Sequence, residues 1–242
     1  SASEVSAISM ISLSKIGVHF SVIFEDLPKK AINERIKLIK PDLIITRNSK
    51  LISFFRTSLK RNNLNKTFIV DPNFKIKNKN STHYNFKNFN IEYTNIRYKY
   101  FKSNKPLFTL FTSGSTGAPK GIQHSSGGYL VYSKHSSKLK FGMNKNSIVL
   151  TASDAGWING HTYALFAPLS FGATTILIES PFMLLDYFFL EKILKNFKIS
   201  ILYLPVTLLR LLKGVIPQKK RMLKNNLKAL GSMGEPLAAT VA

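Results

Sequence analysis

Apolar residues fall into two patterns that alternate along the chain. Short continuous runs of aliphatic, β-branched and aromatic residues predict strands, and segments with apolar positions three or four residues apart predict helices. The expected strands are residues 18–24, 43–46, 67–70, 107–111, 147–151, 174–178, 200–204 and 227–231. The expected helices are residues 31–40, 128–138, 161–171, 185–197 and 206–213. Pro41, Gly172 and Gly214 end three of these helices.

The order of these elements indicates an α/β fold. Strands alternate with helices from residue 107 onward, which is typical of layered, largely parallel sheets flanked by helices. The apolar run 43–46 (LIIT) predicts a strand that is buried on both faces. Ligands of such folds bind at the carboxyl ends of strands, so we expect the loops after Phe111, Thr151 and Leu230 to gather around a site.

Residues 72–104 interrupt this alternation. They are rich in Lys, Asn, Ser and Tyr with little periodicity, which predicts a long irregular connection within the domain. No internal repeat divides the chain. The sequence begins within an expected helix and stops shortly after an expected strand and turn, so we expect residues 1–242 to be an internal part of a larger protein.

The composition argues against several classes of protein. With 242 residues, 44% of them hydrophobic, the chain can form a sizeable core and is not globally disordered. Without Cys it has neither disulfides nor thiolate metal sites, which fits a reducing compartment. It has no apolar run of roughly 20 residues and no signal-peptide pattern at its start, so we expect a cytoplasmic protein. The net charge is +23, but Lys and Arg are scattered among Asn and Ile, so nucleic-acid binding is not the expected main function.

Residues 112–121 (TSGSTGAPKG) combine three kinds of anion-binding group. Gly114, Gly117 and Gly121 allow positive φ angles, and successive amide N–H groups in such a loop can form an anion-binding concavity. Hydroxyl donors and the positive charge of Lys120 complete the groups that a triphosphate needs. The loop is not a Walker A motif, because Gly-Lys-Ser/Thr opening a helix is missing. On composition the alternative is a flexible linker, which the Pro-Lys-Gly sequence and the preceding apolar strand disfavour.

The same ten residues resemble the phosphate-binding signature of the adenylate-forming superfamily, which includes acyl-CoA synthetases, luciferases and peptide-synthetase adenylation domains. Further blocks resemble its acetyl-CoA synthetase branch, namely residues 124–130 (HSSGGYL), 154–163 (DAGWINGHTY), 167–175 (APLSFGATT) and 231–237 (GSMGEPL). The resemblance is strong over residues 105–237 and weaker over residues 16–24. It implies that residues 1–242 are a partial AMP-binding domain, truncated at both ends and belonging to the large N-terminal domain of such an enzyme, with the mobile C-terminal domain absent.

The resemblance also implies a set of site residues. The ATP phosphates would be held by Thr112, Ser113, Gly114, Ser115, Thr116, Gly117 and Lys120, with Lys120 as the catalytic residue. Adenine would contact Gly234, Glu235 and Pro236, and the acyl pocket would be lined by Trp157, Ile158, Asn159 and Met233. From the residues alone, a core aromatic is the favoured interpretation of Trp157, and residues 234–236 could be an ordinary turn. Thr207 and Arg210 match the family but are open to a structural interpretation. The histidines at 124, 135 and 161 lack metal-site spacing, and His135 is expected on the surface of its helix.

The activity implied by the resemblance is ATP-dependent activation of acetate to acetyl-adenylate and then to acetyl-CoA, with release of pyrophosphate and AMP. Its cofactors would be ATP, Mg²⁺ with ligands mostly outside this chain, and coenzyme A as co-substrate. We expect small-molecule partners, no specific nucleic acid and no membrane. Asn159 stands where the family more often has Thr, and its Arg-Gly-Gly-Lys stretch has no counterpart beyond residues 46–50 (TRNSK). Two alternatives therefore stay open: a synthetase for propionate or another short acid, and a non-catalytic remnant whose basic surface binds anions.

Overall fold

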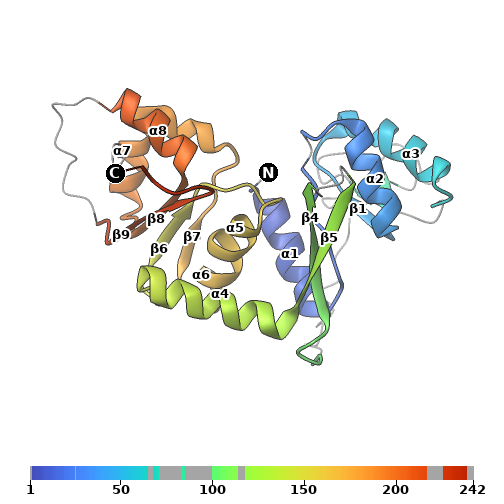
Figure 1. Ribbon diagram of the computed structural model, residues 1–242, viewed down its shortest axis with the longest axis horizontal. Coiled ribbons are helices and arrows are strands. Elements are labelled where there is room, and N and C mark those ends of the chain that lie inside the picture. Colours follow the sequence, from blue (N-terminus) through green and yellow to red (C-terminus); the bar gives the residue numbers. More distant parts are fainter. Residues whose placement is uncertain are drawn as a thin grey trace. The chain divides into compact units, whose positions relative to one another are not determined.

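The computed structural model of the chain (Figure 1) describes residues 2–24, 26–64, 68–70, 83–84, 100–113, 118–216 and 226–238. The chain divides into two compact units. Unit 1 comprises Ser1–Val22, Phe101–Leu110 and Gln123–Ala242, and unit 2 comprises Ile23–Tyr100 and Phe111–Ile122. Both units combine helices with parallel strands, so the predicted α/β class is confirmed.

Unit 1 contains a four-stranded parallel sheet with the strand order β7-β6-β8-β9. Its strands are β6 (Ile148–Thr151), β7 (Thr174–Ile176), β8 (Ile201–Pro205) and β9 (Ala229–Met233). β6 and β7 form within predicted apolar runs, whereas β8 extends one residue and β9 two residues beyond theirs. The register places Thr151 beside Tyr203 and Tyr203 beside Gly231, so the carboxyl ends of β6, β8 and β9 lie at one edge of the sheet.

Helices cover both faces of this sheet (Figure 1). The elements concerned are α4 (Ser126–Phe141), α6 (Ala167–Ser170), the 3₁₀ helix η4 (Pro181–Leu185), α7 (Tyr187–Asn196) and α8 (Val206–Val215). Alternate strand residues face opposite sides, as the pleat requires. Leu150 packs in a cluster with η4, α7 and α8, whereas Val149 packs with Ala167 of α6 and with the end of α4. The helix predicted to end at Gly214 continues to Val215, so that boundary was wrong.

A second core cluster in unit 1 forms around the fully buried ring of Phe108. It includes Met10 of α1 (Glu4–Ile16), a helix whose N-terminus is capped by reciprocal hydrogen bonds between Ser3 and Ser6. Residues 18–24 were predicted to form a strand, but only Phe20 pairs, in a single parallel bridge with Phe108. Two hydrogen bonds hold this bridge, Phe20 N–H to the Leu107 carbonyl and Thr109 N–H to the Phe20 carbonyl. Val22 and Ile23 pack against core clusters without belonging to a ladder, and Val18 is exposed.

The helix predicted at residues 161–171 is three consecutive segments. It begins earlier, with α5 (Ile158–His161), continues as the π-helical segment η3 (Thr162–Phe166) and ends with α6. All five residues of the π-helical segment are buried. π-Helical turns inside α-helices are often found at functional sites, and this one lies directly after the predicted acyl-pocket residues.

Unit 2 contains a small parallel sheet with the order β1-β2-β3. Its elements are β1 (Leu43–Ile45), β2 (Phe68–Val70), β3 (His83–Tyr84), α2 (Lys29–Ile39), the 3₁₀ turn η1 (Ser49–Leu51) and α3 (Ile52–Arg61). The core cluster of this unit includes Ile32 and Ile36 of α2 and Phe55 of α3. β1 was predicted to be buried on both faces, but Leu43 is 44% exposed, because so small a sheet leaves its end open to solvent. Of the predicted connection 72–104, the structure describes only β3 and residues 100–104, so that prediction is not tested.

Strands β4 (Pro106–Ser113) and β5 (Pro119–Ser125) form a two-stranded sheet, and each has residues in both units. The predicted loop 112–121 is therefore shorter than expected, since its first two and last three residues belong to strands. Among the helices that the structure describes, none is both long and apolar enough to cross a membrane.

Candidate functional site

The candidate residues of unit 1 follow the strands that end at one edge of its sheet. Trp157, Ile158 and Asn159 come shortly after β6, and residues 234–236 come directly after β9. β8 lies between these two strands, with Pro205 beside Met233 in the register. β6 and β9 do end at one edge of the sheet, as predicted, but β9 continues past Leu230 to Met233, so the turn there follows Met233. The loop after Phe111 belongs to unit 2, and its part in such a site stays a prediction.

The loop after β6 is organised by Asp154. Its Oδ1 accepts a hydrogen bond of 2.7 Å from Gly156 N–H, and its backbone carbonyl accepts one of 3.1 Å from Trp157 N–H. Trp157 then occupies the N-cap position of α5 in an extended conformation, with 61% of its surface exposed. The interpretation of Trp157 as a core aromatic is therefore wrong. Ile158 is 37% exposed, so two apolar side chains face solvent above a buried loop, as the wall of a pocket for a small apolar group would.

The turn after β9 has one buried and three exposed candidates. Met233, the last residue of the strand, is buried, whereas Gly234, Glu235 and Pro236 are exposed. Gly234 has a φ of 98°, which favours glycine and turns the chain sharply at the edge of the sheet. Glu235 forms an ion pair with Arg210 of α8, with Oε1 and Nη1 3.0 Å apart. Arg210 therefore contacts a candidate adenine-site residue. The sequence alone had left open whether Arg210 has a functional or a structural role.

His161 closes the first turn of α5 and is fully buried. Its ring packs against those of Phe108, Phe20 and Phe166, with the Phe108 ring centroid 4.5 Å away. Burial lowers the pKa of His161 from 6.5 to about 4. The Ala155 carbonyl opposes this shift without reaching hydrogen-bond geometry, His124 adds to it, and Asp154 opposes it. The His161 imidazole is thus a neutral group packed in an aromatic cluster.

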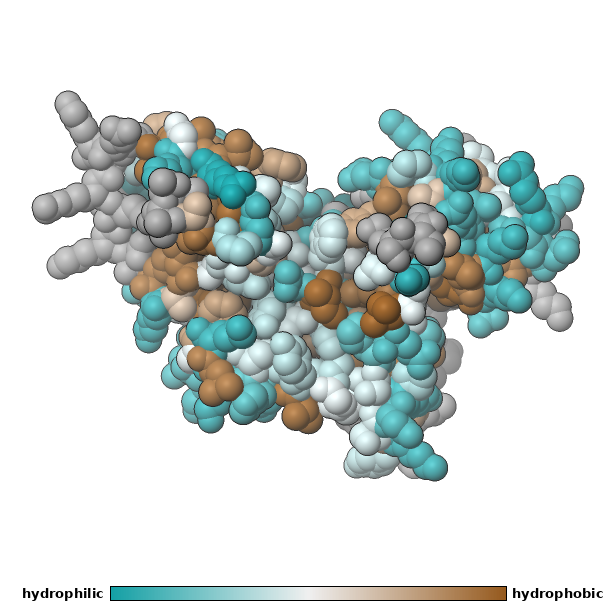
Figure 2. Space-filling model, viewed as in Figure 1, coloured by the Kyte–Doolittle hydropathy of each residue, from teal (hydrophilic) through white to brown (hydrophobic). Residues whose placement is uncertain are grey.

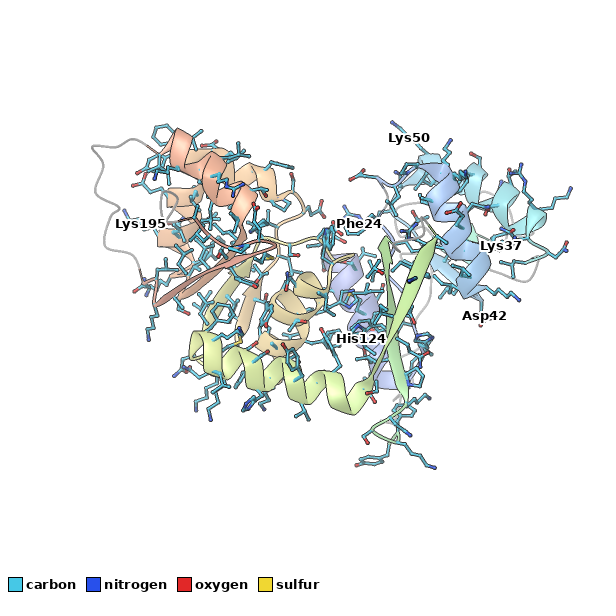
Figure 3. All side chains as sticks on the ribbon, viewed as in Figure 1. Phe24, Lys37, Asp42, Lys50, His124 and Lys195 are labelled. Carbon is cyan, nitrogen blue, oxygen red and sulfur yellow. The ribbon has the colours of Figure 1, made fainter. Side chains whose placement is uncertain are left out.

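The other histidines also have structural places. His124, labelled in Figure 3, is the penultimate residue of β5 and stacks on Phe108 with 4.7 Å between ring centroids. Partial burial lowers the pKa of His124. His135 is exposed on α4, as predicted. Within the described part of the chain, no group of three His, Asp or Glu side chains could hold a metal ion.

The predicted phosphate-binding residues belong to unit 2. Thr112 lies near the end of β4 and Lys120 near the start of β5, and both are exposed. Ser113 is the last residue of β4. The predicted residues between the strands, Gly114, Ser115, Thr116 and Gly117, lie outside the described residues. The exposed ammonium of Lys120 carries its charge at the strand end where the glycine-rich segment rejoins the sheet.

Two features of the candidate site were missed by sequence reasoning. The role of Asp154 had a local signal, since Asp two residues before Gly is typical of a side-chain-stabilised turn. The ion pair between Arg210 and Glu235 had none, because it joins a helix to a turn that lies beyond a further strand. Contacts of this kind depend on the tertiary fold, and no local pattern predicts them.

Comparisons with known proteins agree with the predicted fold and family. The solved structure of Brucella canis acyl-CoA synthetase superposes on 97% of this chain and 41% of its own, with a TM-score of 0.75 and 22% identity, which shows the fold. The profile of the family described as AMP-binding enzyme matches residues 5–242. Acetyl-coenzyme A synthetase 1 of Candida glabrata is 34% identical over 250 residues, covering 97% of this chain and 35% of that protein. Acetyl-coenzyme A synthetase of Helicobacter acinonychis is 32% identical over 248 residues, covering 96% of this chain and 37% of that protein.

The fold is thus that of the acyl-CoA synthetases, layered α/β with parallel sheets. The chain belongs to the AMP-binding enzyme family, because the family profile matches nearly its whole length. It spans about a third of the length of these two relatives. The predicted resemblance is therefore confirmed at the level of family and fold.

Proposed function

We propose that the protein containing this chain activates acetate in two steps. The acetate carboxylate attacks the α-phosphorus of ATP, forming acetyl-adenylate and releasing pyrophosphate. The thiol of coenzyme A then attacks the acyl carbon and displaces AMP, giving acetyl-CoA. The observation that carries the proposal is the likeness to two acetyl-coenzyme A synthetases over 96–97% of the chain.

In this proposal the residues of this chain bind and orient the substrates. The segment from Thr112 to Lys120 would hold the β- and γ-phosphates, with the Lys120 ammonium offsetting the charge of departing pyrophosphate. Residues 234–236 would contact adenine, and Arg210 would fix Glu235 in place for that contact. Trp157, Ile158, Asn159 and Met233 would enclose the acetate methyl group. Mg²⁺, with ligands proposed to lie mostly outside this chain, would neutralise phosphate charge when bound.

The first test is acetate-dependent exchange of labelled pyrophosphate into ATP by the full-length protein, repeated with propionate. Exchange with acetate supports the proposal. Exchange with propionate alone favours a neighbouring synthetase. Asn159 stands where the family more often has Thr, and such a pocket discriminates one methylene by only roughly 1–3 kcal/mol. No exchange with either acid from a folded protein contradicts the proposal and leaves the non-catalytic remnant as the better interpretation.

Lys120→Ala tests the phosphate-binding segment directly. We expect exchange to slow by roughly 10²-fold, because the charge that offsets the departing pyrophosphate is lost. Unfolding is expected to change little, since the Lys120 side chain is exposed. Lys145→Ala, at another exposed lysine, is the matched control and should exchange at the normal rate. Equal rates for both variants would remove Lys120 from the proposed mechanism.

A cytoplasmic location and small-molecule partners complete the proposal. The support for the location is the Cys-free composition, which fits a reducing compartment. Coenzyme A is proposed as co-substrate from the named relatives, although the family's Arg-Gly-Gly-Lys stretch has no counterpart here. Acetyl-CoA formation, measured after exchange is established, tests that half-reaction by itself.

A further inference from the structure

Asp154 accepts two hydrogen bonds within the loop between β6 and α5. Asp154 accepts Gly156 N–H with its carboxylate and Trp157 N–H with its backbone carbonyl. Trp157 in turn caps α5, and its carbonyl accepts His161 N–H at 3.2 Å. The position of the Asp154 peptide group therefore determines where the Trp157 side chain leaves the loop.

Gly160 packs directly against this peptide group. A Cβ atom at Gly160 would lie 2.2 Å from the Asp154 carbonyl oxygen and 2.9 Å from its carbon. Both atoms are backbone, so no flexible side chain can move aside. Gly160 lies within α5 and its φ is not positive, so the requirement is for space and not for an unusual conformation. A hydrogen atom at this position lets the first turn of α5 rest on the loop.

The residues that form this contact are buried, whereas apolar side chains between them in the sequence are exposed. Ala155, Gly156 and Gly160 are buried, whereas Trp157 and Ile158 between them are exposed. The fully buried His161, held among aromatic rings, anchors the end of the same helical turn. The two exposed apolar side chains thus stand on a rigid base whose two contacting parts are the Asp154 carbonyl and Gly160.

We propose that Asp154 and Gly160 are positioning residues for the acyl pocket, setting the placement of Trp157 and Ile158 without touching the substrate themselves. This rests on the proposed function, because it assigns the pocket to an acid substrate. The geometric part, that Gly160 determines where Trp157 lies, stands on the contacts alone.

The central experiment is Gly160→Ala in the full-length protein. We expect kcat/KM for acetate to fall by roughly ten- to a hundredfold, mainly through a higher KM for acetate, because a displaced binding group is costly in a positioned site. The KM for ATP should stay within about twofold of the wild-type value, since the phosphate-binding segment is not part of this loop. Gly214→Ala is the matched control, because nothing lies within 4 Å of a Cβ at that helical glycine.

Trp157 supplies a readout that is independent of activity. It is the only tryptophan among the 242 residues, and the Trp157→Phe protein provides the spectrum to subtract for any tryptophan elsewhere in the full-length protein. Gly160→Ala should shift the emission maximum and the acrylamide quenching of Trp157, and Gly214→Ala should change neither. A normal acetate KM together with unchanged Trp157 fluorescence in folded Gly160→Ala would overturn the proposal. A normal acetate KM with shifted fluorescence would also overturn it, because Gly160 would then have a structural role only.

Two variants of Asp154 keep the inference testable should Gly160→Ala fail to fold. Asp154→Asn retains an Oδ1 acceptor for Gly156 N–H, whereas Asp154→Ala removes it. We expect a larger rise in acetate KM and a larger fluorescence shift for Ala than for Asn, and equal effects would contradict a positioning role. Absence of exchange in the wild type is a failure of the proposed function, and the fluorescence comparison still decides whether Gly160 and Asp154 place Trp157.

Discussion

At the scale of single residues, His161 makes the folded state sensitive to acid. Its pKa is about 4 in the fold and 6.5 in an unfolded chain, so between these values only the unfolded state binds the proton. Lowering the pH from 7 therefore favours unfolding, and the stability lost by pH 4 is about 3 kcal/mol. Urea unfolding at pH 7, 6 and 5 measures the slope.

His161→Phe separates this effect from the titration of other groups. Neither ring nitrogen of His161 has a hydrogen-bond partner among the described residues, so a phenyl ring loses no polar contact there. The variant should be less sensitive to acid than the wild type over pH 5–7. His135→Gln, at an exposed helix position, should retain the wild-type slope. Parallel slopes for the wild type and His161→Phe would show that His161 is not the acid-sensitive group.

At the scale of elements, α7 shows how a polar side chain sets a helix boundary. The apolar pattern predicted a start at residue 185, but the helix begins at Tyr187 because Asp186 is its N-cap. Asp186 Oδ1 accepts the backbone N–H groups of Phe188 at 2.9 Å and Phe189 at 3.1 Å. Asp186→Ala should lower the free energy of unfolding by about 1 kcal/mol, measured by chemical denaturation.

Asp186→Asn is the control for this cap, because an Asn oxygen accepts the same two N–H groups. It should retain most of the stability that Ala loses. A loss as large with Asn as with Ala would assign the effect to the charge of Asp186 at the helix N-terminus instead of to the hydrogen bonds.

At the scale of the whole molecule, the alternation of strands and helices was sufficient to predict the fold class. The parallel strands β6 to β9 are apolar runs bounded by turns, which is a local signal. The pairing of residues 18–24 was overestimated because β-branched composition does not reveal whether a partner strand exists. The beginning of α5 was missed because Ile-Asn-Gly-His has no helical apolar period, its stability coming from the contact of Gly160 with Asp154 and the burial of His161. The candidate residues were found through their resemblance to a family, and their positioning contacts only through the structure.

The charge of the whole chain leads to a last prediction. With 35 Lys and Arg against 12 Asp and Glu, like charges repel within each compact unit. In Figure 2 hydrophilic side chains gather over α2 and α3, and Figure 3 shows Lys37 and Lys50 on the outside of that unit.

Raising NaCl from 0.01 to 0.1 M shortens the screening length from about 30 to about 10 Å, so the melting temperature should rise, by about 2–4 °C for each kcal/mol of repulsion removed. The melting temperature of Lys37→Glu should respond less to added salt than that of the wild type, while Lys37→Arg, which keeps the charge, should follow the wild type. A melting temperature that falls with salt would mean that attractive ion pairs outweigh the repulsion between the surplus cations.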